Sequence, residues 1–288
     1  MRTSNIAIFE DTLTIARQGH YLYDGIEIPL QISAEQMTEV QAFSPERIRQ
    51  LANEEDRAGR SLDVHENIQT WVSGRDSYEA AIEMLKSVSA GSNEKPGVLV
   101  LNFANPVHPG GGVTRGASAQ EEDLCRRSTL YLSLTSRAAG EMYRYNSSLK
   151  GYCASDFMLL SPYVEILKDS VGMPLPETHV VSVLTAAAPM VSRGGIEKDR
   201  LHDLLTQRIH AIFQVAAHCG YRDLVLGAWG CGAFGNDPET MAALFAQEVK
   251  RWNDADSFRF RQIEFAVLRK KNRDSYNYDC FARHFAEK

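Results

Sequence analysis

Two adjacent glutamates, Glu121 and Glu122, follow three successive glycines at positions 110–112 after a short spacer. An apolar run at residues 98–103 precedes the glycines, so we expect a buried strand, a glycine turn and a helix that opens at about Ser118. Consecutive glycines indicate positive φ angles or a ligand pressed against bare backbone, and a phosphorylated sugar is a natural candidate. The neighbouring carboxyl groups could then transfer protons at that sugar.

A helix cap is the competing interpretation of this acidic stretch. Ser118 could be the N-cap, with Glu121 reaching back to it from the third helical position, and acidic residues in a first turn suit the helix dipole. This interpretation can hold for one of the two glutamates. It does not explain the three glycines or Gln120.

A second glycine-rich turn lies at residues 227–239 and also follows an apolar run. Asp237 and Pro238 are typical of the start of a helix. The turn could be an ordinary tight connection. Alternatively, its backbone N–H groups could surround a diphosphate, and the positive end of the following helix would add to the attraction.

Strands and helices in alternation must position both turns. Strands are predicted at residues 68–72, 97–103, 157–160, 163–167, 179–184, 224–229 and 263–268, and helices at residues 76–87, 118–132, 201–217 and 238–252. This order favours an α/β fold with a mostly parallel or mixed sheet covered by helices on both faces. Ligands of such sheets bind beyond the carboxyl ends of the strands, where both glycine turns lie.

The first 65 residues read as a mainly helical extension that packs on the main domain, residues 66–288, in one structural unit. A helix capped around Ser4 ends at Gly19, a hairpin turns at Asp24 and Gly25, and a charged helix runs from the proline at position 45 to about residue 60. No proline-rich or glycine-rich linker follows these elements.

Composition limits the classes of function. The chain has 288 residues, a net charge of −6 and five cysteines without a Cys-x-x-Cys pair. The negative charge argues against general nucleic-acid binding. The cysteines fit neither a disulfide framework nor a zinc site, so we expect a reducing, cytoplasmic location. No stretch reads as a signal peptide or membrane span, and we expect no metal and no cofactor.

The glycines at 110–112, seven spacer residues and then Gln120, Glu121 and Glu122 resemble the signature of the poly(ADP-ribose) glycohydrolases, and the Asn-Phe-Ala-Asn at 102–105 is similar to the strand end of that family. The match is best to the compact bacterial type. The resemblance implies a three-layer α/β/α macrodomain-like fold, poly(ADP-ribose) or another ADP-ribosylated substrate, and ADP-ribose as product.

The resemblance also assigns residues. It makes Glu122 the catalytic residue and lets Glu121 fix the neighbouring ribose hydroxyls. It places ADP-ribose against two groups of residues, which are Asn105, Gly111, Gly112, Val113 and Gln120 in the first turn and Gly230, Cys231, Gly232, Ala233, Phe234 and Gly235 in the second. Phe234 matches an aromatic residue that packs on the ligand in macrodomains, although a buried core phenylalanine is an alternative.

Helix geometry supports a single dominant acid. Adjacent helical residues diverge by roughly 100°, so Glu121 and Glu122 cannot easily flank one bond from opposite faces as the carboxylates of ordinary glycosidases do. The leading hypothesis is an exo-acting poly(ADP-ribose) glycohydrolase. A mono-ADP-ribosyl hydrolase and a non-catalytic macrodomain that binds ADP-ribose are the alternatives, and the intact Gln-Glu-Glu favours an enzyme.

Overall fold

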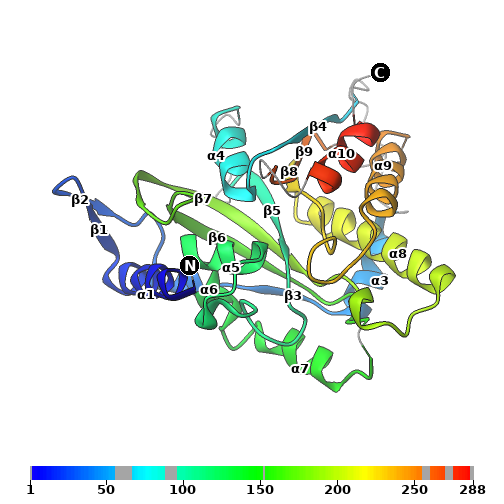
Figure 1. Cartoon of the computed structure of the whole chain (residues 1–288), viewed down its shortest axis with the longest axis horizontal. Helices are drawn as coiled ribbons and strands as arrows, with labels where there is room; N and C mark the ends of the chain where they lie inside the picture. Colours follow the sequence, from blue (N-terminus) through cyan, green and yellow to red (C-terminus); the bar gives the residue numbers. More distant parts are fainter. Residues whose placement is uncertain are drawn as a thin grey trace.

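The computed structural model describes residues 2–55, 67–87, 96–151, 153–254, 260–269 and 275–285. Its centre is a seven-stranded mixed sheet in the order β3-β6-β7-β5-β8-β9-β4 (Figure 1). The strands are β3 (Gln41–Phe43), β4 (Gln69–Ser73), β5 (Val98–Phe103), β6 (Met158–Lys168), β7 (Pro174–Ala186), β8 (Asp223–Leu226) and β9 (Gln262–Ala266). The pairs β6/β7 and β3/β6 are antiparallel and the other pairs are parallel.

Helices cover both faces of the sheet because residues of its central strand alternate between two cores. Val98 and Val100 pack with one helical layer, and Leu99 and Leu101 with the other. The first layer contains α1 (Arg2–Gln18), α4 (Ser77–Ser87), α5 (Gln120–Arg127), α6 (Leu130–Leu134) and α7 (Gly140–Ser148). The second contains α3 (Pro45–Glu55), α8 (Lys198–His218), α9 (Pro238–Asp254) and α10 (Ser275–Phe285). The predicted three-layer α/β/α fold is confirmed.

The N-terminal elements are joined closely to this sheet. The predicted hairpin forms from β1 (His20–Tyr23) and β2 (Ile26–Pro29), with positive φ at Asp24 and Gly25. After the short α2 (Ala34–Thr38), strand β3 pairs with β6 and so belongs to the main sheet. The predicted end of α3 near residue 60 and the predicted domain boundary at residues 65 and 66 lie outside the described residues.

The sequence predicted two separate strands at 157–160 and 163–167. This prediction was wrong, because β6 is a single strand that runs through both ranges. Pro162 lies where the register with β7 shifts, between Ser161 and Val164. Proline lacks an N–H group and is tolerated at such irregularities. The prolines at positions 174 and 176 likewise lie in the first residues of β7 and do not break it.

The predicted helix at 118–132 starts later and is divided into two. Ala119 is the N-cap of α5, without a side-chain hydrogen bond, so the predicted capping box at Ser118 is wrong. The helix ends at Arg127 because Ser128 is extended, with φ −148° and ψ 177°, and forms a β-bridge with Ile166. Helix α6 begins two residues later.

Parallel pairing brings the two glycine-rich turns together. Strands β5 and β8 are neighbours and run in the same direction, so the turns that follow them leave the same edge of the sheet. Strand β7, parallel to β5 on its other side, ends at this edge too. In the part of the chain that the structure describes, no helix is both long and apolar enough to cross a membrane.

Candidate active site

Glu121 is a buried carboxyl group that fastens the start of α5 to the end of β5. Its side chain accepts hydrogen bonds from Asn102 Nδ2 at 3.3 Å and from the backbone N–H of Asn105 at 2.7 Å. Burial raises the pKa of Glu121 to about 8, and the nearby charge of Glu122 acts in the same direction against these hydrogen bonds. The group can therefore hold a proton near neutral pH.

Glu122 has one oxygen held and one oxygen free, although only 8% of the residue is exposed. Oε1 accepts a hydrogen bond from the backbone N–H of Gly112 at 2.8 Å. Oε2 is buried and has no hydrogen-bond partner among the described residues. A buried carboxylate oxygen without a partner is costly, and such costs are concentrated at functional sites. The unpaired oxygen makes Glu122 the candidate proton donor or acceptor of this site.

The glycines at 110–112 make room for these carboxyl groups. Gly111 has φ +58°, and a β-carbon on it would overlap Oε1 of Glu122 and lie 3.1 Å from Oε2 of Glu121. Gly110 has φ +66° and faces the ring of Tyr131. The glycine run thus makes room for the protein's own Glu121 and Glu122 side chains, in addition to any ligand.

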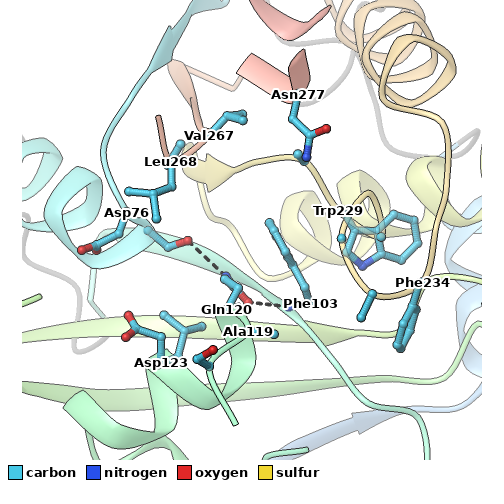
Figure 2. A pocket seen from close by; sticks show the side chains of 18 of the residues that line it. Asp76, Phe103, Ala119, Gln120, Asp123, Trp229, Phe234, Val267, Leu268 and Asn277 are labelled. Carbon is cyan, nitrogen blue, oxygen red and sulfur yellow. Dashed lines mark hydrogen bonds between the residues drawn. The ribbon is translucent and has the colours of Figure 1, made fainter. Parts of the chain in front are cut away.

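Gln120 and Val113, both predicted to contact the ligand, make mostly protein contacts. The Gln120 side chain accepts from the N–H of Phe103 at 2.9 Å and donates to the carbonyl of Leu101 at 2.8 Å and to Ser77 Oγ at 3.1 Å (Figure 2). Its amide therefore locks α5 to β5 and α4. The Val113 side chain is fully buried and packs in the core below the turn.

The second glycine-rich turn is held by side chains at its ends and open in its middle. Asn236 donates to the carbonyl groups of Gly230, at 3.1 Å, and Pro189, at 2.9 Å, and so joins this turn to the segment after β7. Gly235 faces Ser192, whose N–H donates to the carbonyl of Phe234 at 2.9 Å. A β-carbon on Gly232, in contrast, would meet no atom of the described residues within 4 Å.

A cavity of about 580 Å³ lies between this turn and the start of α5 (Figure 2). Gly230, Gly232, Ala233, Phe234 and Gln120 line it, so the structure brings these predicted residues together. Other predicted residues do not line it, namely Cys231, Gly235, Asn105, Gly111, Gly112, Val113, Glu121 and Glu122. The two carboxyl groups lie at the adjoining glycine run, beside Gln120 in the sequence.

Several cavity residues were missed by the sequence analysis. Trp229 is buried in the second turn and donates from Nε1 to the carbonyl of Ala186 at 3.0 Å. Five more follow or end parallel strands, where the rule that ligands bind beyond the carboxyl ends of strands could have found them, namely Asp76, Ser77, Phe103, Val267 and Leu268. Asn277 enters from α10, which no pattern in the sequence linked to the site.

The cavity has an acidic end, on the other side of Gln120 from Phe234 (Figure 2). Asp76 and Asp123 lie there, and both accept a hydrogen bond from the buried Arg127, at 2.9 and 2.8 Å. Burial opposes the charge of Arg127, but the two carboxylates outweigh it and raise its pKa. Arg126 also lines the cavity and donates to Asp123 at 3.1 Å, so both carboxylates of this end are already paired with arginine side chains.

Among the described residues, no three His, Cys, Asp or Glu side chains are grouped so that they could hold a metal ion. The absence of a metal and of a cofactor stays a prediction.

Comparison with known proteins agrees with this geometry. A family model of the microbial-type PARG catalytic domain, where PARG is poly(ADP-ribose) glycohydrolase, matches residues 9–169. The crystal structure of PARG from Thermomonospora curvata is similar with a TM-score of 0.84 and 31% identity, over 98% of this chain and 100% of that chain. No curated protein matches the sequence.

Two similar structures contain ligands. PARG from Thermomonospora curvata bound to the inhibitor ADP-HPD has a TM-score of 0.82 and 30% identity, over 98% of this chain and 100% of that chain. PARG from Deinococcus radiodurans in complex with ADP-ribose has a TM-score of 0.75 and 32% identity, over 89% of this chain and 98% of that chain.

Proposed function

The chain belongs to the microbial-type poly(ADP-ribose) glycohydrolase family, and from this membership we propose that it hydrolyses ribose–ribose O-glycosidic bonds of poly(ADP-ribose) from the chain end and releases ADP-ribose. The observation that supports this most directly is the unpartnered Oε2 of Glu122. A module that only binds ADP-ribose has no need of a buried, unsatisfied carboxylate oxygen.

Glu122 is proposed to act as both acid and base. Its Oε2 would give a proton to the departing ribose oxygen and later take one from the attacking water, while the N–H of Gly112 holds Oε1 and fixes the direction of the carboxyl group. An oxocarbenium-like ribose would form between the two steps. Glu121 is turned toward Asn102 and Asn105. It would therefore not lie across the glycosidic bond from Glu122, and Glu122 would act alone in both steps.

Glu121 is proposed to fix the ribose hydroxyls. With a pKa of about 8, caused mainly by burial, it can both donate and accept a hydrogen bond near neutral pH. Such a group can hold two neighbouring hydroxyls in one orientation.

The rest of ADP-ribose is proposed to occupy the cavity. The diphosphate would lie on the open backbone at Gly232, where a β-carbon would meet no described atom within 4 Å. The adenosine would pack against Phe103 and Leu268, which both line the cavity. The ADP-ribose complex of the Deinococcus radiodurans protein supports this choice of ligand.

The remaining predictions concern the setting of the enzyme. ADP-ribosylated molecules are the proposed partners, without general nucleic-acid or membrane binding, because the net charge is −6. A cytoplasmic location is still predicted from the five cysteines, which are all free thiols in the structure.

Substitution of Glu122 tests the proposal. Glu122→Gln keeps the size of the side chain and an acceptor for the N–H of Gly112 but removes the exchangeable proton. Turnover of labelled poly(ADP-ribose) should fall by about 10²–10⁴-fold while ADP-ribose still binds. Glu121→Gln should change affinity as well as rate.

The wild-type protein decides between the three functions. Release of ADP-ribose from chains supports the proposed activity. Cleavage of mono-ADP-ribosylated protein alone would identify the other hydrolase. Tight ADP-ribose binding without any cleavage would leave a binding module, and full activity of Glu122→Gln would remove the assigned acid.

A further inference from the structure

The first turn of α1 lies directly on the spacer between the glycine run and the glutamates. Asn5 Nδ2 donates a hydrogen bond to the carbonyl of Gly116 at 3.1 Å. Gly116 has φ +73°, and a β-carbon on it would overlap the backbone carbonyl oxygen of Arg2. Only glycine allows this close approach, so the spacer is shaped to receive α1.

The contact at Gly116 continues to Glu122 through a closed turn. The N–H of Gly116 donates to the carbonyl of Val113 at 3.0 Å, and the N–H of Ala117 donates to the carbonyl of Gly112 at 3.1 Å. The N–H of the same Gly112 holds Oε1 of Glu122 at 2.8 Å. A displacement of Gly116 therefore moves the donor that orients the catalytic carboxyl.

Further contacts make α1 a fixed support. Lys168, buried in β6, donates to the carbonyl of Ile8 at 2.8 Å and pairs with Asp11 at 2.7 Å. Thr12 donates to the carbonyl of Arg126 in α5. The ring of Phe9 packs edge-on against Tyr131, with 4.9 Å between centroids. The helix cannot move as a unit without disturbing these buried contacts.

We propose that Asn5 is a positioning residue for catalysis, which acts through Gly116 and Gly112 on the carboxyl group of Glu122. The inference rests on the proposed function and adds to it, since Asn5 lies outside the region at residues 9–169 that the family model matches. Asn5 also lines the cavity near the start of α5. The first turn of α1 thus supports the turn that holds Glu122, whereas the rest of the helix covers the sheet.

Asn5→Asp separates this role from general stability. The first turn of α1 has no acidic residue, so aspartate suits the helix dipole, but it replaces the N–H donor with a carboxylate that faces the carbonyl of Gly116. We expect kcat on poly(ADP-ribose) to fall about tenfold, because small misplacement of a catalytic group is costly. KM and the Kd of ADP-ribose should change less than about twofold, with little change in melting temperature.

Asp11→Ala is the matched control on the same helix. It removes the carboxylate partner of the buried Lys168 in the middle of α1, while the hydrogen bond from Lys168 to the carbonyl of Ile8 stays, so the melting temperature should fall while kcat stays at the wild-type value. Unchanged kcat in Asn5→Asp, or an equal loss of kcat in both variants, would overturn the positioning role.

The amide resonance of Gly112 tests the contact without catalysis. Loss of the hydrogen bond to Glu122 in Glu122→Ala should shift the ¹H–¹⁵N resonance of Gly112, and Asn5→Asp should shift it in the same direction. If wild-type protein cleaves no chains, the proposed function fails while this shift still decides the contact. If chains are cleaved but Asn5→Asp leaves the Gly112 resonance unmoved, only the positioning role fails.

Discussion

Gly111 and Gly232 stand in similar glycine-rich turns, but their surroundings are opposite. A β-carbon on Gly111 would overlap Glu122 and crowd Glu121, whereas one on Gly232 would meet no described atom within 4 Å. Gly111 also requires positive φ, at +58°, which is not the case for Gly232. The first glycine is needed by the folded protein itself, and the second leaves space that the fold does not use.

A glycine-rich turn can therefore serve two purposes that look alike in a sequence. In the first turn, glycine lets carboxyl groups approach the backbone, and the N–H of Gly112 becomes a donor to the enzyme's own Glu122. In the second turn, the backbone around Gly232 remains open toward the cavity. Chemistry and diphosphate binding should therefore respond separately to substitution.

The largest effect is expected for Gly111→Ala. The new methyl group would displace the carboxyl of Glu122 and also strain a residue at positive φ, so turnover should fall at least about 10²-fold. Single-turnover cleavage of poly(ADP-ribose) measures this, with circular dichroism to show that the variant is folded.

Gly220→Ala controls for the backbone strain. Gly220 follows α8 with φ +81°, and a β-carbon on it would meet no atom of the described chain within 4 Å. Alanine should therefore cost about 1 kcal/mol of stability and leave turnover intact. Wild-type turnover in Gly111→Ala would show that Glu122 is not held where the structure places it.

Gly232→Val should affect binding and not folding. Valine at this open, unstrained position would stand between the backbone N–H groups and a diphosphate. ADP-ribose should bind about 30-fold more weakly, which corresponds to about 2 kcal/mol of lost charge-assisted hydrogen bonds. Titration calorimetry measures the change, and Gly232→Ala should give an intermediate loss. Equal affinity in all three proteins would place the diphosphate elsewhere.

The sequence predicted which turns matter because strand order alone brings them together. The apolar runs that became β5 and β8 were recognisable, and the carboxyl-end rule then places both turns at one edge. The sequence could not show whether the Glu121 carboxyl turns toward Asn105 or toward Ser118. In either arrangement the carboxyl accepts a hydrogen bond from a backbone N–H group near the start of the helix, and the structure has the one from Asn105.

Other parts of the site depend on distant contacts that leave no local pattern. Gln120 was predicted to bind the ligand, but its amide is occupied by partners on β5 and α4 that are 17 to 43 residues away. Asn277 reaches the cavity only because α10 packs on α9 and β4. Likewise, the need for glycine at position 116 is visible only when α1 is in place.

Phe234 combines a contact to the cavity and a contact to the core within the second turn. Its ring lines the cavity, yet it also packs partly buried against the core. Phe234→Ala should weaken ADP-ribose binding by up to about tenfold, the order of an aromatic stacking contact, and destabilise the fold by less than the roughly 3–5 kcal/mol of a fully buried phenylalanine.

Phe245→Ala, at a fully buried ring of α9, supplies the upper limit for the stability loss. Ligand-free melts and calorimetry on both variants compare the two contributions. A full core-sized loss of stability in Phe234→Ala, with ADP-ribose affinity unchanged, would assign Phe234 to the core alone.

The pH dependence of stability also separates the two turns. Burial raises the pKa of Glu121 from 4.5 to about 8, so the folded state binds this proton more tightly than the unfolded state. The stabilisation is complete below about pH 4.5 and is lost as the pH rises to about 8. The free energy of unfolding should fall by at most about 1.4 kcal/mol per pH unit in this window.

Glu121→Gln should remove that fall, so its free energy of unfolding, measured by urea titration from about pH 5 to about pH 8, should depend less on pH than that of the wild type. Glu83→Gln is the control, because the hydrogen bond from Lys86 lowers the pKa of Glu83 and cannot produce the same sign. Gly232→Val should keep the wild-type pH dependence, since it touches no carboxyl group among the described residues. Parallel curves for wild type and Glu121→Gln would mean that Glu121 ionises in the folded protein as readily as in the unfolded chain, and the proton we assign to the ribose contact would then be absent at neutral pH.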